Sequence, residues 1–322
     1  MQCSQDITLY KMRSSMNAIK LVPALKSYIW GGYRLKELFG RENGGDKIAE
    51  SWEVSVHPDG FSGCTGGTLA QYLTENPEAV DGEGKPFPVL VKYIDAKQNL
   101  SVQVHPNDDY ALKIEGDNGK TEMWYIVGAD NGAGIYCGFK RDTNRKEFLE
   151  KVKDGTVEDL LNFIPVKAGD CFLIKAGTVH AIGAGCVICE VQQSSNVTYR
   201  VYDYNRRDAQ GNLRPLHIEK AIEVIDFSAF RDETGGGAFS PCAGGRIRLL
   251  TECKYFRCRE LLLDGEYSEK AERSFIAVNA VEGSGKIDGR EFTSGDSFFI
   301  PCGNRFTLSG KAKIIFTDEG AV

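Results

Sequence analysis

The chain has 322 residues, of which 42% are hydrophobic and 26% are charged. This length and composition are typical of a globular protein with two domains, each long enough to bury a core. The net charge of -6, without a concentrated basic patch, argues against a protein that binds nucleic acid. The apolar runs are too short to cross a bilayer, and the first residues lack the apolar segment of a signal peptide. We therefore expect a cytoplasmic protein whose ten cysteines are reduced thiols.

Short strands dominate the sequence after an N-terminal extension at residues 1–15. Segments rich in β-branched and aromatic residues, separated by Gly, Asn or Asp, predict strands at residues 87–96, 100–107, 122–129 and 134–139. Apolar residues at helical spacing predict helices at residues 108–116, 143–164 and 216–227. The glycine-rich residues 233–246 predict a loop, and strand patterns resume from residue 247. The predicted fold class is therefore all-β with a few peripheral helices.

An internal repeat indicates two related β-barrels. The stretch "GDCFLIKAGTVHAIG" begins at Gly169, and "GDSFFIPCGNRFTLSG" begins at Gly295. Each has a Gly-Asp turn, an apolar strand, a turn of small residues and a second strand. The first copy has His180 where the second has Phe306, so only the first copy keeps a metal-binding residue type. We expect a catalytic domain at residues 16–232 and a degenerate β domain at residues 233–322.

Four polar side chains have the spacing expected of a metal site inside the first barrel. In "LSVQVHPND", residues 100–108, the alternation of a strand puts Ser101, Gln103 and His105 on one face. Glu122 begins the next strand, and His180 lies in the repeat. Two nitrogen and two oxygen ligands suit zinc and leave room for water or substrate, although manganese, iron and cobalt also fit. Each residue alone is weak evidence, and a single histidine before a proline is more often a hydrogen-bonded edge residue.

An arginine and a carboxylate are predicted to face the same interior. In "NVTYRVYDYNR", Arg200 shares a strand face with Thr198 and Tyr202, and Glu190 lies on the polar face of the preceding strand with Gln192. Burying an arginine costs desolvation free energy unless it has a partner or a function. The alternatives are a structural salt bridge and a guanidinium that binds an anion.

Other conspicuous residues are more simply explained by structure. Cys186 and Cys189 have an odd spacing on a strand, which predicts opposite faces and two packing residues rather than a metal or redox pair. His57 follows a strand and is predicted to support a turn. His217 lies near a helix start and is predicted to be structural or exposed.

These segments resemble known families. "GDCFLIKAGTVHAIG" is similar to the second cupin motif, in which Gly, Pro and His follow one another at fixed spacing, although Lys175 stands at the proline position. The chain from Met16 resembles the class I mannose-6-phosphate isomerases in their short bacterial form. The matching segments are "IWGG", "ESWEVSVHPDG", "PVLVKYIDAKQNLSVQVHPND", "GKTEMWYIV", "GTVHAIG" and "SNVTYRVYDYNR".

The resemblance implies two cupin-like jelly-roll barrels and an aldose–ketose isomerase that interconverts mannose 6-phosphate and fructose 6-phosphate through a cis-enediol. It implies one divalent ion, with zinc favoured, and a phosphosugar substrate, and it leaves the oligomeric state open. The implied roles are metal ligands at Gln103, His105, Glu122 and His180, catalytic residues at Arg200, Glu190 and Lys120, and substrate-binding residues at Ser101 and Lys92.

Three questions stay open on the sequence. The catalytic base that takes the carbon-bound proton of the sugar could be Glu190, a hydroxide on the metal, or a lysine. A cupin that binds sugar or regulates without catalysis is the alternative function. An iron-dependent cupin oxygenase is a third reading, which the glutamine ligand disfavours.

Overall fold

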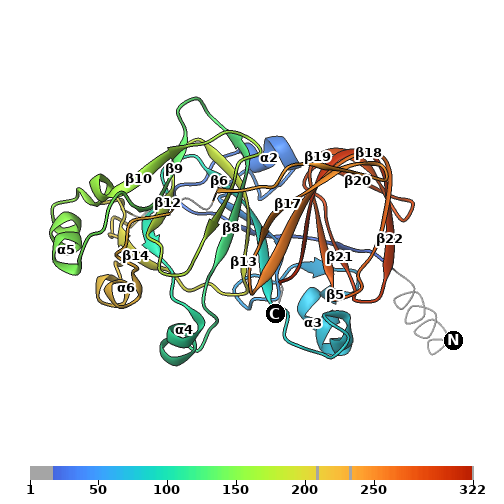
Figure 1. Ribbon diagram of the computed structural model, residues 1–322, viewed down its shortest axis with the longest axis horizontal. Coiled ribbons are helices and arrows are strands. Elements are labelled where there is room, and N and C mark those ends of the chain that lie inside the picture. The colour runs from blue at the N-terminus through green and yellow to red at the C-terminus, as the bar shows by residue number, and fades with distance from the viewer. Residues whose placement is uncertain (1–16, 208–209, 232–233, 321–322) are drawn as a thin grey trace.

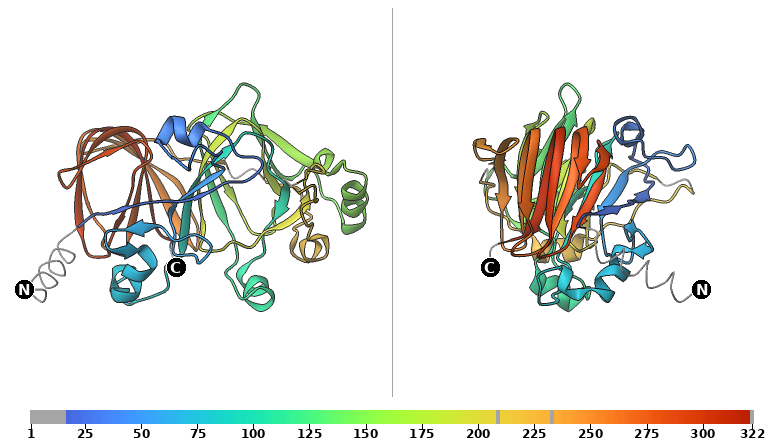
Figure 2. Two further views of the ribbon diagram at one scale, coloured as in Figure 1. Left: turned by 180° about the vertical axis from the view of Figure 1, so that it is seen from behind. Right: turned by 90° about the vertical axis from the view of Figure 1, so that its right-hand side faces the viewer.

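A computed structural model describes residues 17–207, 210–231 and 234–320. The predicted extension at residues 1–15 lies outside the described residues. Two β units lie side by side along the long axis, one formed by strands β2 to β15 and the other by β1 together with β16 to β22 (Figures 1 and 2). Among the described residues, no helix has the length and apolarity needed to cross a membrane.

A seven-stranded antiparallel sheet forms the centre of the molecule, and both of its faces are covered. Every residue of β6 and β13 is buried. One face packs in a core around Trp124 and Ile126, and the other packs around Tyr93 and Tyr125 against the C-terminal unit. Burial on both faces explains why these strands read as nearly continuous apolar runs. In spatial order the strands are β15 (Thr234–Gly235), β11 (Cys171–Ile174), β8 (Glu122–Ala129), β13 (Cys186–Gln193), β6 (Val89–Ala96), β3 (Glu50–Val54) and β2 (Ala24–Lys26).

A five-stranded sheet faces the central sheet and completes the first unit. Its strands, in spatial order, are β10 (Leu161–Pro165), β9 (Gly134–Phe139), β12 (His180–Ile182), β7 (Val102–Val104) and β14 (Tyr199–Tyr202). Phe139, Phe148 and Val201 belong to a further core on this side, together with Ile222. Helices α5 (Arg145–Lys153) and α6 (Ile218–Val224) supply two of these residues and lie at the outer end of the unit in Figure 1. The two sheets of this unit remain separate sheets rather than one closed ring.

The C-terminal unit is a single eight-stranded sheet that curves around its own core. The sheet is built from β1 (Ile19–Leu21), β21 (Ser297–Ile300), β19 (Ile276–Ile287), β22 (Arg305–Glu319), β18 (Phe256–Lys270), β17 (Gly245–Glu252), β16 (Ser240–Cys242) and β20 (Arg290–Thr293). Phe298, Phe306 and Phe316 are buried in its interior. The edge strand β1 comes from the start of the described chain and pairs with β21, so the N-terminal part of the chain supplies a strand to the C-terminal sheet.

Short elements fill the connections. These are α2 (Arg34–Phe39), the hairpin β4 (Gly63–Cys64) and β5 (Gly67–Thr68), α3 (Leu69–Glu75), α4 (Asp108–Ile114), and the 3-10 turns at Pro77–Ala79 and Val157–Leu160. The predicted strands at residues 87–139 and the helices at 108–116 and 216–227 are confirmed as β6 to β9, α4 and α6. The predicted all-β class with cupin-like units is also confirmed.

Two local predictions were wrong. The predicted helix at residues 143–164 ends at Lys153, because Gly155 adopts a left-handed φ of 71° and residues from Leu161 pair with β9 instead. The loop predicted at residues 233–246 contains β15 and β16, which pair with β11 and β17. Glycines there permit close approach: a Cβ on Gly235 would lie 2.5 Å from the Leu250 carbonyl oxygen.

The internal repeat is confirmed in three dimensions. Gly169 precedes β11, a turn and β12, and Gly295 precedes β21, a turn and β22. Gly169 and Gly295 both have a left-handed φ, 93° and 90°, as their Gly-Asp turns require. His180 begins β12 and faces the first unit's interior, whereas Phe306 is fully buried among apolar side chains. The corresponding position therefore lies in a polar interior in the first copy and in an apolar, packed core in the second.

A buried ion pair joins the two units. Glu53 on β3 is fully buried, and its two oxygens accept hydrogen bonds from Arg41 Nη2 at 2.9 and 2.8 Å. Ser297 Oγ of β21 donates to the same carboxylate at 2.9 Å, and Arg41 also donates to the Gly295 carbonyl oxygen. The second repeat is thus anchored to the central sheet through one carboxylate.

We expect Glu53→Gln to destabilise the protein by about 3 kcal/mol, because it leaves the largely buried Arg41 charge without its partner. Thermal unfolding of the metal-loaded protein measures this. Glu147→Gln, which removes an exposed ion pair with Arg141, is the matched control and should leave the melting temperature nearly unchanged. Equal melting temperatures for the two variants would contradict a structural role for the Glu53 pair.

Candidate active site

The predicted metal ligands lie between the two sheets of the first unit. His180 on β12 pairs directly with Gln103 on β7, and Arg200 on β14 pairs with Gln103 from the other side. These three residues therefore form one row across the five-stranded sheet. Glu122, the first residue of β8, reaches the same place from the central sheet. His105 follows β7 by one residue, with its side chain on the same face as Gln103.

Three of the four ligands form a tight, buried cluster. The ligand atoms of His105, Glu122 and His180 all lie within 4.8 Å of one another. His105 Nε2 is 3.1 Å from Glu122 Oε1, and His180 Nε2 is 3.8 Å from Glu122 Oε2. Gln103 lies beside them, with its amide nitrogen 3.4 Å from His180 Nε2. A 180° turn of this amide would present its oxygen instead, because amide oxygen and nitrogen are alternative assignments of one shape.

Backbone carbonyls set the tautomer of both histidines. His105 Nδ1 lies 2.8 Å from the carbonyl oxygen of Val197, and His180 Nδ1 lies 2.8 Å from that of Thr178. A carbonyl oxygen only accepts, so each Nδ1 carries the proton and donates it. Both Nε2 atoms are consequently left with a lone pair directed at Glu122. This outer hydrogen bond is the usual way in which proteins orient a metal-binding imidazole.

The charge state of the cluster fits a divalent cation. Burial and the Lys120 ammonium lower the pKa of His105 to about 3, and burial also lowers the pKa of His180, so both imidazoles are neutral at pH 7. Burial, the largest single effect, would raise the pKa of Glu122, but Lys120 and the two histidines together outweigh it and hold that pKa well below its usual range. Although Lys120 Nζ lies 2.6 Å from Glu122 Oε1, neither carboxylate oxygen accepts a well-directed hydrogen bond from a described residue. Buried oxygens in this condition are suited to metal coordination.

A second row of polar side chains crosses the central sheet. Trp124, Glu190, Lys92 and Trp52 occupy paired positions on β8, β13, β6 and β3. Trp124 Nε1 donates to Glu190 Oε2 at 2.8 Å, and Lys92 Nζ lies 3.1 Å from Glu190 Oε1. Lys92 Nζ also lies 5.3 Å from the centre of the Trp52 ring. Strand register thus explains why these residues, distant in sequence, line one wall.

A pocket of about 290 Å³ opens over these two rows. Its walls include six of the predicted site residues, Lys92, Ser101, Gln103, Lys120, Glu190 and Arg200. His105, Glu122 and His180 lie buried below. The sequence analysis placed Thr198 on the strand face of Arg200, but it did not identify the remaining polar and aromatic wall residues, which are Tyr28, Trp30, Glu50, Asn196 and Arg214. One of them carried a usable signal, because Glu50 begins the strand pattern "ESWEV".

Arg200 does not form a salt bridge with Glu190, which was the structural alternative for this residue. Its Nε donates to Ser101 Oγ at 3.3 Å, and its Nη1 donates to the Pro215 carbonyl oxygen at 2.9 Å. Glu190 is paired with Lys92 instead. Within the described ranges no carboxylate lies within ion-pair distance of Arg200, which leaves its charge directed at the pocket.

The predictions for the other conspicuous residues hold. His57 Nδ1 accepts a hydrogen bond from the Asp59 backbone at 3.2 Å in a turn. His217 Nδ1 accepts from the Arg200 backbone N–H at 3.1 Å and so holds β14 in place. Cys186 and Cys189 belong to different cores on opposite faces of β13, and burial raises the pKa of both thiols.

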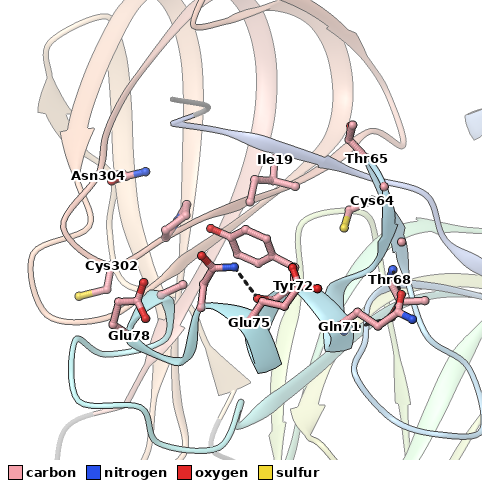
Figure 3. Close-up of a pocket in the computed structure, with 15 residues that line it drawn as sticks. Ile19, Cys64, Thr65, Thr68, Gln71, Tyr72, Glu75, Glu78, Cys302 and Asn304 are labelled. Atoms are coloured by element: carbon pink, nitrogen blue, oxygen red, sulfur yellow. Dashed lines mark hydrogen bonds between the residues drawn. The ribbon is translucent and has the colours of Figure 1, made fainter. Parts of the chain in front are cut away.

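A larger cavity, of about 500 Å³, lies away from this chemistry. It lies between α3, the β4–β5 hairpin and the turn after β21 (Figure 3). Tyr72, Glu75 and Glu78 lie on its walls, and none of the predicted site residues does. The proposed chemistry therefore belongs to the smaller pocket.

Comparison with known proteins agrees with the fold and with the family that the sequence resembles. A family model described as phosphomannose isomerase type I, catalytic domain, matches residues 18–142, and one described as mannose-6-phosphate isomerase, cupin domain, matches residues 246–318. Mannose-6-phosphate isomerase ManA of Bacillus subtilis is 38% identical over 305 residues, which cover 91% of this chain and 96% of the relative. Mannose-6-phosphate isomerase of Streptococcus mutans is 38% identical, covering 85% of this chain and 89% of the relative.

Solved structures share the fold. The crystal structure of mannose 6-phosphate isomerase from Bacillus subtilis matches with a TM-score of 0.87 and 33% identity, covering 94% of this chain and 99% of that one. A mannose 6-phosphate isomerase bound with zinc and yttrium matches with a TM-score of 0.74 at 19% identity, and covers 95% of this chain and 100% of that one.

The fold and the buried ligand cluster define a metal-binding enzyme of the cupin type. The chain belongs to the type I mannose-6-phosphate isomerase family, and its activity is that of a mannose-6-phosphate isomerase. The resemblance to the short bacterial form is confirmed.

We expect the purified protein to bind about one divalent ion per chain, because Phe306 replaces the histidine in the second copy. His180→Ala should lose that ion, whereas His57→Ala, at a histidine outside the cluster, should keep it. Metal analysis of the dialysed proteins checks this. Two ions per chain, or one that survives in His180→Ala, would place the metal elsewhere.

Proposed function

We propose that this isomerase uses one zinc ion and moves a proton between C1 and C2 of an open-chain hexose 6-phosphate through a cis-enediol. The observation that carries the proposal is the cluster of His105, Glu122 and His180 at the base of a charged pocket. Gln103 would complete the set as an amide oxygen ligand. The substrate and product are mannose 6-phosphate and fructose 6-phosphate.

Zinc is supported by the donor set and by a relative. Two neutral imidazoles and a carboxylate are common ligands of catalytic zinc, which keeps one position for substrate or water. A solved isomerase of the same fold is bound with zinc. When bound, the ion would polarise the sugar carbonyl and stabilise negative charge on the adjacent oxygens.

Glu190 is our assignment for the base that takes the carbon-bound proton. It lines the pocket, and burial and the Glu122 charge raise its pKa, which brings a carboxylate toward the range useful for proton transfer near neutral pH. Trp124 Nε1 fixes its orientation. Lys92 is a poor base, because Glu190 and Glu50 outweigh the effect of burial and raise its pKa further. Its ammonium is suited to hold Glu190 and a sugar hydroxyl in place.

Arg200, Lys120 and Ser101 are assigned to orientation and charge. Arg200 pairs in register with the metal-side Gln103 and presents its guanidinium beside Ser101, so it is suited to stabilise the negative charge of the enediolate. Lys120 Nζ lies 3.3 Å from His105 Nε2 and lines the pocket, where it can donate to a substrate oxygen. Ser101 is suited to hydrogen-bond a sugar hydroxyl.

The cytoplasm is the proposed location, and a phosphosugar is the proposed partner. Every cysteine among the described residues is a free thiol, which is the usual condition in a reducing compartment. We further propose that residues 16–232 form the catalytic domain and residues 233–322 the degenerate β domain, on the basis of the repeat.

An assay for fructose 6-phosphate formation from mannose 6-phosphate tests the function. We expect turnover that a chelator abolishes and that zinc restores better than manganese, iron or cobalt. A cupin that only binds sugar would bind the phosphosugar without converting it. Full turnover in chelator, with the ion shown to be absent, would contradict the metal-dependent mechanism.

We expect Arg200→Met to lower kcat about 10²- to 10³-fold while the metal stays bound, because it removes donors that act on developing charge. Steady-state kinetics, metal content and a melting curve measure the three effects separately. A rise in KM alone would instead mean that Arg200 grips the ground-state substrate. Normal kcat/KM in the folded, metal-loaded variant would remove Arg200 from the site.

A further inference from the structure

Arg200 lies on the last strand of the five-stranded sheet, where one side of the strand lacks a strand partner. β14 pairs with β7 on its inner side, and no strand in the described part of the chain pairs with its outer side. An open edge leaves backbone groups without partners and favours local opening of the strand. A guanidinium that stabilises developing charge must be held close to one geometry, because small displacements are costly in rate. The position of Arg200 therefore depends on what covers the outer side of β14.

His217 covers the outer side of β14 at Arg200. The Arg200 backbone N–H donates to His217 Nδ1 at 3.1 Å, and the His217 backbone N–H donates to the Arg200 carbonyl oxygen at 2.7 Å. Both backbone groups of Arg200 are therefore bound by one residue. Two positions before His217, the Pro215 carbonyl oxygen accepts from Arg200 Nη1 at 2.9 Å. Residues 215–217 thus hold the backbone and the guanidinium of Arg200 together.

The side chain of His217 does not cap the helix that it begins. His217 is the N-cap residue of α6, with a φ of -120° and a ψ of 45°. A residue at this position usually has an extended backbone and a short polar side chain that accepts from the first turn of the helix. The His217 side chain makes no such bond with a described residue, and its Nδ1 is bound to β14 instead. The imidazole therefore stabilises the strand rather than its own helix.

The ring of His217 is a neutral acceptor. Because Nδ1 accepts the Arg200 N–H, the ring proton lies on Nε2, which is the opposite of the arrangement in the two metal-binding histidines. Burial, the Arg200 charge and the Lys220 charge lower the pKa of His217 and outweigh the effect of Glu115. The neutral ring keeps the lone pair on Nδ1 that the Arg200 N–H needs.

Other contacts fix the surroundings of His217. Glu115 Oε1, at the end of α4, accepts from Lys220 Nζ of α6 at 2.7 Å and from the Tyr199 hydroxyl of β14 at 2.8 Å. The ring centres of Tyr199 and His217 are 6.3 Å apart. His217 lines a cavity of about 330 Å³ beside the active-site pocket and is not among the described residues that line that pocket. Any effect of His217 on the reaction must therefore pass through Arg200.

We propose that His217 is a positioning residue for catalysis, which holds Arg200 in its productive geometry through Nδ1 and the backbone N–H. This inference rests on the proposed function, in which Arg200 stabilises the charge of the enediolate. Because the His217 side chain lies outside the pocket, its loss should change turnover through the position of Arg200 and leave the metal ligands intact.

The test compares His217→Ala with Tyr110→Phe in zinc-loaded enzyme. Tyr110→Phe removes a hydrogen bond from α4 to Glu223 of α6, so it loosens the same helix without a change at Arg200. We expect His217→Ala to lower kcat roughly 10-fold, with KM changed less than about threefold and the metal retained. Tyr110→Phe should match the wild type. An equal kcat for His217→Ala and Tyr110→Phe would overturn the proposal.

His217→Asn is the conservative variant that tests the role of Nδ1. The asparagine side chain can place its amide oxygen, an acceptor, close to the position of Nδ1. We expect this variant to recover most of the kcat that His217→Ala loses, at a similar melting temperature. Equally low kcat values for the two variants, both folded and metal-loaded, would show that the acceptor is not what matters at this position.

Hydrogen exchange of the β14 amides measures the hold on the strand without any turnover. We expect the Arg200 amide to exchange faster in His217→Ala than in the wild type or in Tyr110→Phe, because it loses its hydrogen-bond acceptor. Unchanged exchange in a folded His217→Ala variant would show that His217 does not hold β14.

A double-mutant cycle separates this inference from the proposed function. If His217 acts through Arg200, His217→Ala should lower kcat far less in the Arg200→Met background, because the group that it positions is already gone. A further loss of about 10-fold in that background would overturn the inference and leave the proposed function intact. A normal kcat for Arg200→Met alone would contradict the proposed role of Arg200, and the positioning role of His217 with it.

Discussion

The ionised carboxylate of Glu122, buried between two sheets, is the constraint on which the rest of the site depends. Its oxygens accept no well-directed hydrogen bond from a described residue, and Lys120 supplies the nearby positive charge. Such a group is costly unless a cation offsets it. The histidines cannot do so, because carbonyl oxygens fix their protons on the far nitrogens and burial keeps them neutral. The same features that make the cluster unfavourable by itself make it complementary to a divalent ion.

The C-terminal unit supports the strand that carries this carboxylate. Alternate residues of β8 face opposite sides, so Glu122 and Trp124 face the site while Tyr125 faces the C-terminal sheet. The Tyr125 hydroxyl donates to Glu260 at 2.7 Å, and Arg248 binds Glu260 while donating to the Gly169 carbonyl oxygen. Gly169 begins the repeat that leads to His180. The C-terminal unit thus braces β8, which supplies Glu122, and the Gly-Asp turn with which the first repeat begins.

Periodicity was sufficient to predict most of the strands and the fold class, because these depend on residues close in sequence. The ligand cluster joins residues as distant as His105 and His180, and its prediction also needed the repeat and the resemblance to the isomerase family. The pairing of Glu190 with Lys92 depends on the register between β13 and β6, which no local pattern specifies. Arg214 was missed for a similar reason, since a loop turned back by Tyr204 and Asn205 brings it to the pocket. The helix α3 could have been found, because Thr68 and Gln71 form a capping box. The prediction of a loop at residues 233–246 was wrong because the glycines were interpreted as a sign of an irregular segment. In the structure they allow neighbouring strands to approach closely.

The position of β1 has a consequence for how the protein is made. This strand leaves the ribosome first among the described strands, yet its partner β21 is among the last to be synthesised. The backbone N–H and C=O groups of β1 therefore have no strand partner until nearly the whole chain has emerged from the ribosome. Closing so long a loop is entropically costly, so we expect β1 to dock after the central sheet has formed. Completion of the C-terminal sheet then depends on full-length translation, and a truncated chain leaves an open sheet edge that chaperones and proteases can recognise.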